Sequence, residues 1–440
     1  MKHLFKNLIL TGLLLSGTTY AQQVRHLDLS EAVNLGIENS KNLRLSQNKI
    51  DEALAHLAVV KDNALPSGNA SFLYNHAEIP GNTLVIGESA PLHLPKRADA
   101  FVGTAAVEQL VYGGGKLRYA EASTRLLAEV ARLDADKSKE EIAYAVISTY
   151  YNLFKIIQSK KVVEQNLESI ASQLKQAQRF FSQGIVTKND VLRFQLQEAN
   201  VSLTGMEIEN NRKIVNYNLN IMLGLDENTI LDISDPEAHL QMAPNLGSFT
   251  EMAMENRQEL RQLDLQNHAA EVNTKSVKAE TLPSVGVGAN LYYINPSGRF
   301  IPPVNQFISP ITLGANLSWN IGSLWTTRHK VAEARIQQKS ITLQKDVLTD
   351  QVKTEINKSY HDYLLAVNRI KVLEASIVQA TENDKLLASK YQNNVASATD
   401  RIDAETLLYQ ARINLEIAKA DAGLAWYTLL KSTGKIDTSK

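Results

Sequence analysis

Four segments of the chain alternate between apolar residues and small or polar residues with a period of two, as β-strands do. The pattern is clearest in the second half, where one face carries these residues: Val285, Val287, Ala289, Leu291, Tyr293, Ile311, Leu313, Ala315, Leu317 and Trp319. In the first half it is weaker, although Phe72 and Tyr74 still share a face. We expect strands at about 67–78, 98–111, 283–294 and 309–321.

The segments between the strands follow a helical spacing. Hydrophobic residues recur at intervals of four and three, which predicts coiled-coil seams. Very long helices are expected at about 116–183 and 325–393, each on the order of 100 Å at ~1.5 Å per residue. The expected seams, including those of the helices that follow, are Val163, Leu167, Ile170, Leu174, Ala177 and Phe181; Leu192, Leu196, Ala199, Leu203 and Met206; Leu373, Ile377, Ala380, Asp384, Leu387 and Tyr391; and Leu408, Ala411, Leu415, Ala418, Ala422, Ala425 and Leu429.

The sequence contains an internal duplication. Glu38-Asn39 reappears 217 residues later as Glu255-Asn256, and Lys161-Val-Val-Glu164 reappears 210 residues later as Lys371-Val-Leu-Glu374. Each copy reads as helix, strand, loop, strand, very long helix, break and return helix. We therefore expect two structural repeats, 22–230 and 231–440, and the second closes with a short polar tail that we expect to fray.

The first helix of each repeat is expected at about 29–63 and 248–280. Each is followed by a Leu-Pro pair, Leu65-Pro66 or Leu282-Pro283. Proline cannot continue a helix and restricts the residue before it, so these pairs mark where the helices end.

Both long helices break at related sequences. Gly184 and Asn394 are residue types that adopt the left-handed conformation at a helix end. Three residues later, Thr187 with Asp190 and Ser397 with Asp400 read as capping boxes that start the return helices. We predict two helix reversals, each the tip of an antiparallel coiled coil.

The N-terminus reads as a signal peptide rather than as part of the fold. Lys2 and Lys6 precede an apolar run, and small residues follow, with cleavage expected after Ala21. The chain has no cysteine, which excludes disulfides and a cysteine-linked lipid anchor. Residues 1–21 are therefore expected to direct export.

Beyond this segment, no stretch approaches the roughly 18 apolar residues that a spanning helix needs. A membrane-spanning form would then require a closed β-barrel. The smallest such barrels have about eight strands, so chains with four strands each would have to pool them, two copies giving eight and three giving twelve. A soluble sheet would show the same alternation, but no other segment is left to cover the apolar face.

Composition narrows the possible functions. The net charge is −1 and the pI is near 6.8, so the chain lacks the excess of positive charge that would indicate nucleic-acid binding. Gly113-Gly-Gly-Lys116 lacks the Ser or Thr and the spacing of a phosphate loop. The nine histidines are scattered and no nucleophile motif occurs. We expect no cofactor, no bound metal and no catalytic activity.

With its duplication, its strand pairs between helices, and the tip motifs Gly184-Ile-Val-Thr-Lys-Asn-Asp-Val-Leu192 and Asn394-Val-Ala-Ser-Ala-Thr-Asp-Arg-Ile-Asp403, the chain resembles the TolC-like outer-membrane efflux proteins (outer membrane factors). The resemblance covers essentially the whole mature chain. It implies a mixed, mostly α fold, in which long antiparallel coiled-coil helices form a periplasmic α-barrel. It further implies that each chain gives four strands to a trimeric, twelve-stranded outer-membrane β-barrel.

The resemblance also implies roles for residues at the tips. Asp400 and Asp403 match aspartates that form an acidic ring at the periplasmic entrance, and Asp190 and Tyr391 match residues that latch it. Ala396 stands where the best-known latch has an arginine. Helix capping explains Asp190 and Asp400 equally well, whereas Asp403 has no capping duty.

The sequence therefore predicts a passive channel in the outer membrane of a Gram-negative bacterium, extending into the periplasm. As the resemblance implies, it would be the exit duct of a tripartite efflux pump or a type I secretion system. Its expected partners are two further copies of the chain, outer-membrane lipid, a periplasmic adaptor (membrane fusion) protein and an inner-membrane pump of RND, ABC or MFS type. The alternative is an exported coiled-coil structural or adhesion protein without a pore.

Overall fold

The computed structural model describes residues 24–436 except 82, 86, 88, 89, 94, 95, 237–244 and 296–306. The predicted signal peptide lies outside the described residues. Two compact units divide the chain: Met1–Ser40, Glu140–Leu246 and Asn357–Lys440 form unit 1, and Lys41–Lys139 and Gly247–Ile356 form unit 2. Each unit takes residues from both predicted repeats, so the repeats are not separate domains.

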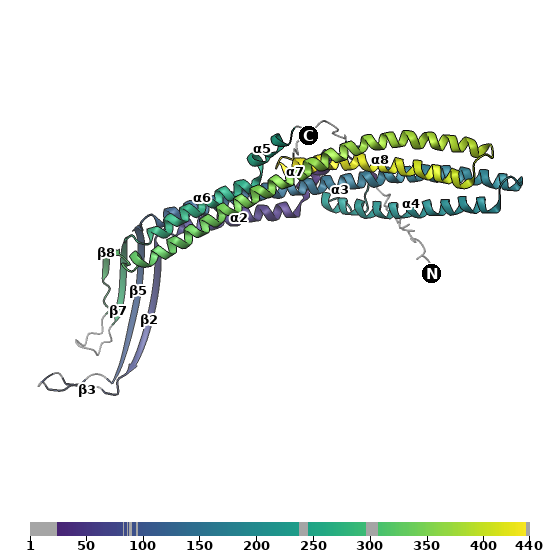
Figure 1. Ribbon diagram of the computed structural model, residues 1–440. Helices are drawn as coiled ribbons and strands as arrows, with labels where there is room; N and C mark the ends of the chain where they lie inside the picture. The colour runs from purple at the N-terminus through teal and green to yellow at the C-terminus, as the bar shows by residue number, and fades with distance from the viewer. Residues whose placement is uncertain are drawn as a thin grey trace, which may run out of the picture. The chain divides into compact units, whose positions relative to one another are not determined.

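Unit 2 contains an antiparallel four-stranded sheet in the order β2-β5-β7-β8 (Figure 1). Its strands are β2 (Ser67–Glu78), β5 (Arg97–Tyr112), β7 (Ser284–Asn295) and β8 (Ile311–Ser318). All four were predicted from the period of two. β8 ends three residues early because Asn320 O already accepts the amide of Ser323, where the next helix begins (3.0 Å). A short hairpin, β3 (Thr83–Leu84) and β4 (Leu92–His93), was not predicted.

The helices of unit 2 bury small residues along their length. They are α2 (Lys41–Asp62), α5 (Leu246–Asn256), α6 (Gln258–Ala279) and the first parts of α3 (Lys116–Ser182) and α7 (Ser323–Gln392). Ala128, Ala135, Ala269 and Ala279 are buried, which allows close helix packing. Polar contacts fix the pairing, such as Ser123 Oγ donating to Ala269 O (3.0 Å).

Unit 1 is built around an extended hydrophobic core. It contains β1 (Val24–Leu27) paired in parallel with β6 (Ile230–Ile233), together with α1 (Leu29–Asn39), α4 (Lys188–Leu223), α8 (Ala398–Ser432) and the later parts of α3 and α7. Tyr150 and Leu153 of α3 pack against Leu219 and Leu223 of α4. The Tyr150 hydroxyl donates to Leu27 O (3.0 Å) and Ser234 O (2.9 Å), which ties α3 to the small sheet.

The prediction of a single helix at the start of each repeat is wrong, because two helices lie in each of these places. Ser40 separates α1 from α2, and Arg257 separates α5 from α6; both residues have extended ψ angles of 117° and 118°. At the first break, Asn39 Nδ2 donates to Leu223 O (2.9 Å), and at the second, Arg257 binds Glu355 (2.9 Å). The two breaks lie 217 residues apart, the same offset as the sequence repeat.

One predicted seam is also wrong. Leu192, Leu196, Leu203 and Met206 of α4 are 50%, 63%, 59% and 66% exposed. In this stretch of α4, Phe194 and Val201 pack within the chain instead. Both series follow helical spacing, and local spacing does not tell which of two stripes faces the rest of the same chain. Phe181 is likewise exposed, while the seam on α8 is buried at Leu408, Ala411, Ala418, Ala422 and Leu429.

Two further observations complete the fold. Ile436, in the tail expected to fray, is buried in the core of unit 1. Within the ranges given above, no helix is both long and apolar enough to cross a membrane.

The Tyr150→Phe variant tests the link between α3 and the small sheet. It removes the donor to Ser234 O and one of the donors to Leu27 O, so the free energy of unfolding should fall by about 1 kcal/mol. Chemical denaturation in detergent measures this change. Tyr217→Phe is the control, because its hydroxyl makes an exposed contact to Glu227; equal effects of the two substitutions would contradict the prediction.

Candidate functional site

The candidate site lies at the two helix reversals of unit 1, and the backbone geometry of both follows the predicted pattern. Gly184 has φ +73° and Asn394 has φ +58°, the one positive φ outside glycine in the described part of the chain. Ile185 N donates to Phe180 O (2.9 Å) and Val395 N donates to Lys390 O (2.8 Å). These bonds close the ends of α3 and α7 and turn the chain back.

Both return helices begin with the predicted capping box. In the first, Thr187 Oγ1 accepts from Asp190 N (3.3 Å), and Asp190 Oδ2 accepts from Thr187 N (2.8 Å) and Thr187 Oγ1 (2.7 Å). In the second, Ser397 Oγ accepts from Asp400 N (3.1 Å), and Asp400 Oδ2 accepts from Ser397 N (3.0 Å) and Ser397 Oγ (2.8 Å). Each aspartate thus starts a helix.

The cap also stabilises the ionised form of Asp400. The hydroxyl of Ser397, and after it the Ser397 amide, hold the pKa of the Asp400 carboxyl below its ordinary value. The hydrogen bonds favour the ionised form. Asp400 is therefore a fixed negative charge at the start of α8.

Asp403 lies one turn further along α8 and is exposed, as is Asp400. Residues three apart share a helix face, so the two carboxylates lie on one side of α8. Asp190 belongs to the other hairpin, at the start of α4. The structure thus places Asp400 and Asp403 together and gives Asp190 its own position on the first tip.

Tyr391 occupies a different environment from the aspartates. It is 3% exposed and packs between Phe180 of α3 and Phe194 of α4, with ring centroids 6.0 and 5.8 Å away. Ala177 and Ala398 complete this tip cluster. A residue from the second hairpin is thereby buried between the two helices of the first.

The hydroxyl of Tyr391 adds nothing polar to this contact. It is buried and has no hydrogen-bond partner among the residues that the structure describes. Burial, with a smaller contribution from the charge of Asp190, raises the pKa of Tyr391. Ala396, where the best-known latch of the resembling family has arginine, packs against the same cluster. Within one chain, the two tips are therefore joined by apolar contact.

Sequence reasoning missed a buried polar layer beside the tips. Arg401 is 7% exposed and forms an ion pair with Asp384 of α7. Glu405 is equally buried and accepts a hydrogen bond from Gln173 Nε2 of α3 (2.5 Å). A charged residue at a seam position, Asp384, was the signal that could have indicated a buried partner. The layer joins three helices and borders a small polar cavity of about 140 Å³.

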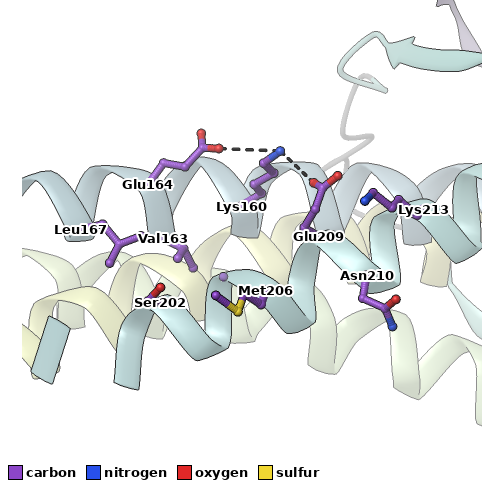
Figure 2. A pocket seen from close by; sticks show the side chains of 10 residues that line it. Lys160, Val163, Glu164, Leu167, Ser202, Met206, Glu209, Asn210 and Lys213 are labelled. Atoms are coloured by element: carbon purple, nitrogen blue, oxygen red, sulfur yellow. Dashed lines mark hydrogen bonds and ion pairs between the residues drawn. The ribbon is translucent and has the colours of Figure 1, made fainter. Parts of the chain in front are cut away.

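A second feature of unit 1 is a groove between α3 and α4, with a volume of about 450 Å³ (Figure 2). The helices come close at Gly205, where an added Cβ would lie 3.3 Å from Val163 Cγ1. Along one side, Lys160 Nζ contacts Glu209 (2.8 Å) and Glu164 (3.7 Å). The groove is therefore apolar at its floor and charged along its edge.

Glu209 is the most strongly perturbed carboxyl in this groove. Arg212, and after it Lys160, bind its carboxylate and lower its pKa to about 2. The carboxylate of Glu209 therefore stays negatively charged at physiological pH. Among the described residues, no group of three or more His, Asp or Glu side chains is arranged to hold a metal ion.

Comparisons with known proteins agree with this architecture. A sequence model of the outer membrane efflux protein family matches residues 32–225 and 250–435. The outer membrane efflux protein BepC of Brucella suis biovar 1 (strain 1330) is 20% identical, covering 98% of this chain and 91% of the relative.

Two solved structures show the same fold. CusC, described as forming a transmembrane channel, gives a TM-score of 0.80 at 12% identity, covering 93% of this chain and 92% of that one. The outer membrane protein VceC of Vibrio cholerae gives a TM-score of 0.75 at 15% identity, covering 92% of this chain and 96% of that one. At these identities the structural likeness concerns the fold alone.

The chain belongs to the outer membrane efflux protein family. The resemblance noted in the sequence is thereby confirmed, together with the expected localisation in the outer membrane and the function as an efflux channel.

Two substitutions of Tyr391 distinguish an apolar tip contact from a polar one. Tyr391→Phe should leave the tips as well ordered as before, because the hydroxyl forms no hydrogen bond. Tyr391→Ala should destabilise the contact by about 3 kcal/mol or more. Hydrogen exchange of residues 177–194 measures the effect. Phe181→Ala is the control because Phe181 is exposed; equally fast exchange in Tyr391→Phe and Tyr391→Ala would contradict the prediction.

Proposed function

We propose that this chain is the exit duct of a tripartite efflux or type I secretion assembly, which conducts substrates passively from the periplasm to the exterior. An adaptor and an inner-membrane transporter of RND, ABC or MFS type would engage it and supply the energy. The observation that carries the proposal is the pair of capped helical hairpins, on a chain that also holds an uncovered four-stranded sheet. A catalytic role is not part of the proposal.

Three copies are the proposed working unit. The strands β2 and β8 each have one neighbour within the described sheet, so their outer edges are open to pairing. Four strands are too few for a closed barrel, whose smallest membrane forms have about eight. Three copies would pool twelve strands.

An exposed stripe on α4 also supports this assembly. Leu192, Leu196, Leu203 and Met206 follow coiled-coil spacing but are uncovered within the chain. Such a stripe needs a helical partner. A neighbouring copy would supply it, so that the helices of three chains form a closed sheath.

At the entrance, Asp400 and Asp403 would act as an acidic ring. Both are exposed on one side of α8, and three chains would bring six carboxylates to the pore. Rings of carboxylates attract cations. Asp190 has its cap at the first tip, and the cluster around Tyr391 would hold the two tips of each chain together when the entrance is closed.

The acidic ring can be tested by conductance. The purified protein in planar bilayers should form cation-preferring channels, and Asp403→Asn should weaken both this preference and block by multivalent cations. Lys188→Gln, also at a tip, is the control for a change of charge that leaves the ring intact. Unchanged selectivity and block in Asp403→Asn and in an Asp400→Asn/Asp403→Asn double variant would exclude the ring.

The trimer can be tested through the exposed stripe. Leu196→Lys/Leu203→Lys places two charges where a neighbouring helix is expected, and it should abolish trimers seen by chemical crosslinking in detergent. The matched control, Gln195→Lys/Ser202→Lys, adds the same charges on α4 outside the stripe. Wild-type crosslinking of the Leu196→Lys/Leu203→Lys variant would refute this interface, and a monomeric wild-type protein would refute the duct itself.

A further inference from the structure

An uncovered apolar surface lies where strand β8 passes into helix α7. We call it the junction belt, and it consists of Trp319, Ile321, Leu324 and Trp325. These side chains are 49%, 55%, 50% and 61% exposed. Four large apolar side chains exposed within seven residues indicate an interaction surface rather than ordinary surface composition.

The belt continues the apolar face of β8. Leu313 and Leu317 are strongly exposed, and Trp319 and Ile321 occupy the next alternate positions of the sequence. The indole N–H of Trp319 donates to Thr281 O (3.1 Å), which fixes the ring at this end of the sheet. The belt is therefore an extension of the sheet surface into the helix.

The other strand ends add to the belt. Ser67 at the start of β2 pairs with Glu108 near the end of β5, and Ser284 at the start of β7 pairs with Ser318 at the end of β8. β5 and β7 are paired in the same way, so all four strand–helix junctions lie at one end of the sheet. Leu65, Tyr112 and Leu282 are also exposed at this end.

Basic side chains follow the apolar ones. Arg328 and Lys330 follow the belt after Thr326 and Thr327, and Lys116 and Arg118 begin α3 at the same end of the sheet. Lys116 (3.2 Å) and Lys330 (2.9 Å) share one carboxylate, that of Glu280. These cations, first Lys330 and then Lys116, lower the pKa of Glu280. Arg118 and Arg328, by contrast, have no carboxylate partner among the described residues, so their charge is available to an anionic ligand.

The first turns of α7 have one covered side. Thr327 is buried, whereas Trp325 and His329, which lie two positions on either side of it, are exposed. At about 100° per residue, these positions fall on the opposite side of the helix from Thr327. Trp325 therefore extends away from the packed interior of unit 2.

We propose that the junction belt and the basic residues beside it form a binding surface for anionic phospholipid headgroups, in the membrane leaflet nearest the helices. Indole rings favour the boundary between acyl chains and headgroups, and basic side chains just beyond this depth attract anionic phosphates. The order along the chain, apolar strand face, tryptophans and then cations, matches the order of these layers. The inference rests on the proposed function, which places the sheet in the membrane.

Tryptophan fluorescence tests the depth of the belt. The chain has three tryptophans, and the third, Trp426, packs against Tyr363 in unit 1. Three variants with phenylalanine at two of the positions each keep a single tryptophan. The full-length mature protein is reconstituted in vesicles of phosphatidylcholine and phosphatidylglycerol, with brominated phosphatidylcholine as quencher. Emission of Trp319 and Trp325 should be lost, that of Trp325 most with bromine near the headgroup, whereas Trp426 should keep its emission.

The fluorescence outcomes separate the inference from the proposed function. If Trp319 is quenched and Trp325 keeps its emission as Trp426 does, the sheet is in the membrane but the belt is not, and the inference is overturned. If neither Trp319 nor Trp325 is quenched in protein bound to vesicles, the proposed function itself fails.

A second experiment tests the charge. In detergent, added phosphatidylglycerol should raise the Tm of the wild-type protein more than phosphatidylcholine does. Arg118→Gln/Arg328→Gln should weaken the apparent affinity for phosphatidylglycerol by roughly tenfold or more, since each basic side chain near an anionic surface contributes measurably. Arg179→Gln/Arg193→Gln, at the helix tips, is the control and should bind as the wild type does. The lipid assignment would be overturned if Arg118→Gln/Arg328→Gln bound phosphatidylglycerol as tightly as the control variant does. It would also be overturned if inorganic phosphate raised the Tm of the wild-type protein as much as phosphatidylglycerol does.

Discussion

A helix of 67 or 70 residues can bury an apolar seam only along its own length, against other helices. This constraint explains much of the rest of the structure. The chain must turn back, so Gly184 and Asn394 adopt left-handed conformations and a capping box restarts each helix. Close packing over such a length favours small residues, and alanines fill much of the seams. One chain still leaves stripes uncovered, so the same constraint calls for further copies.

The features that were predicted correctly depend on local patterns. Alternation fixed the strands, and a short series of glycine or asparagine, hydroxyl and aspartate fixed the reversals. The pairing of β1 with β6 was missed because it joins four-residue segments more than 200 residues apart. The stripe of α4 at Leu196 was assigned to the wrong partner, since Phe194 and Val201 offer a second stripe with equally good spacing. Which stripe packs within the chain depends on tertiary contacts that local spacing does not specify.

The candidate site shows the same division between local and tertiary information. The capping geometry of Asp190 and Asp400 followed from residues three positions apart. The surroundings of Tyr391 did not, because Phe180 and Phe194 come from other helices. The resemblance implied a latch role for Tyr391 without its contacts, whereas the structure buries the ring among apolar groups and leaves its hydroxyl unbonded within the described residues. Family resemblance located the residue, and packing defined its chemistry.

The open edges of β2 and β8 have a consequence for the life of the newly made chain. A single copy exposes two unpaired strand edges, the apolar face of the sheet and an uncovered helical stripe. Open edges of this kind are templates for pairing with any available strand. Assembly therefore competes with aggregation. A copy that pairs with a wrong strand is lost from assembly. The yield of assembled channels then depends on the rate at which copies pair as well as on the stability of the product.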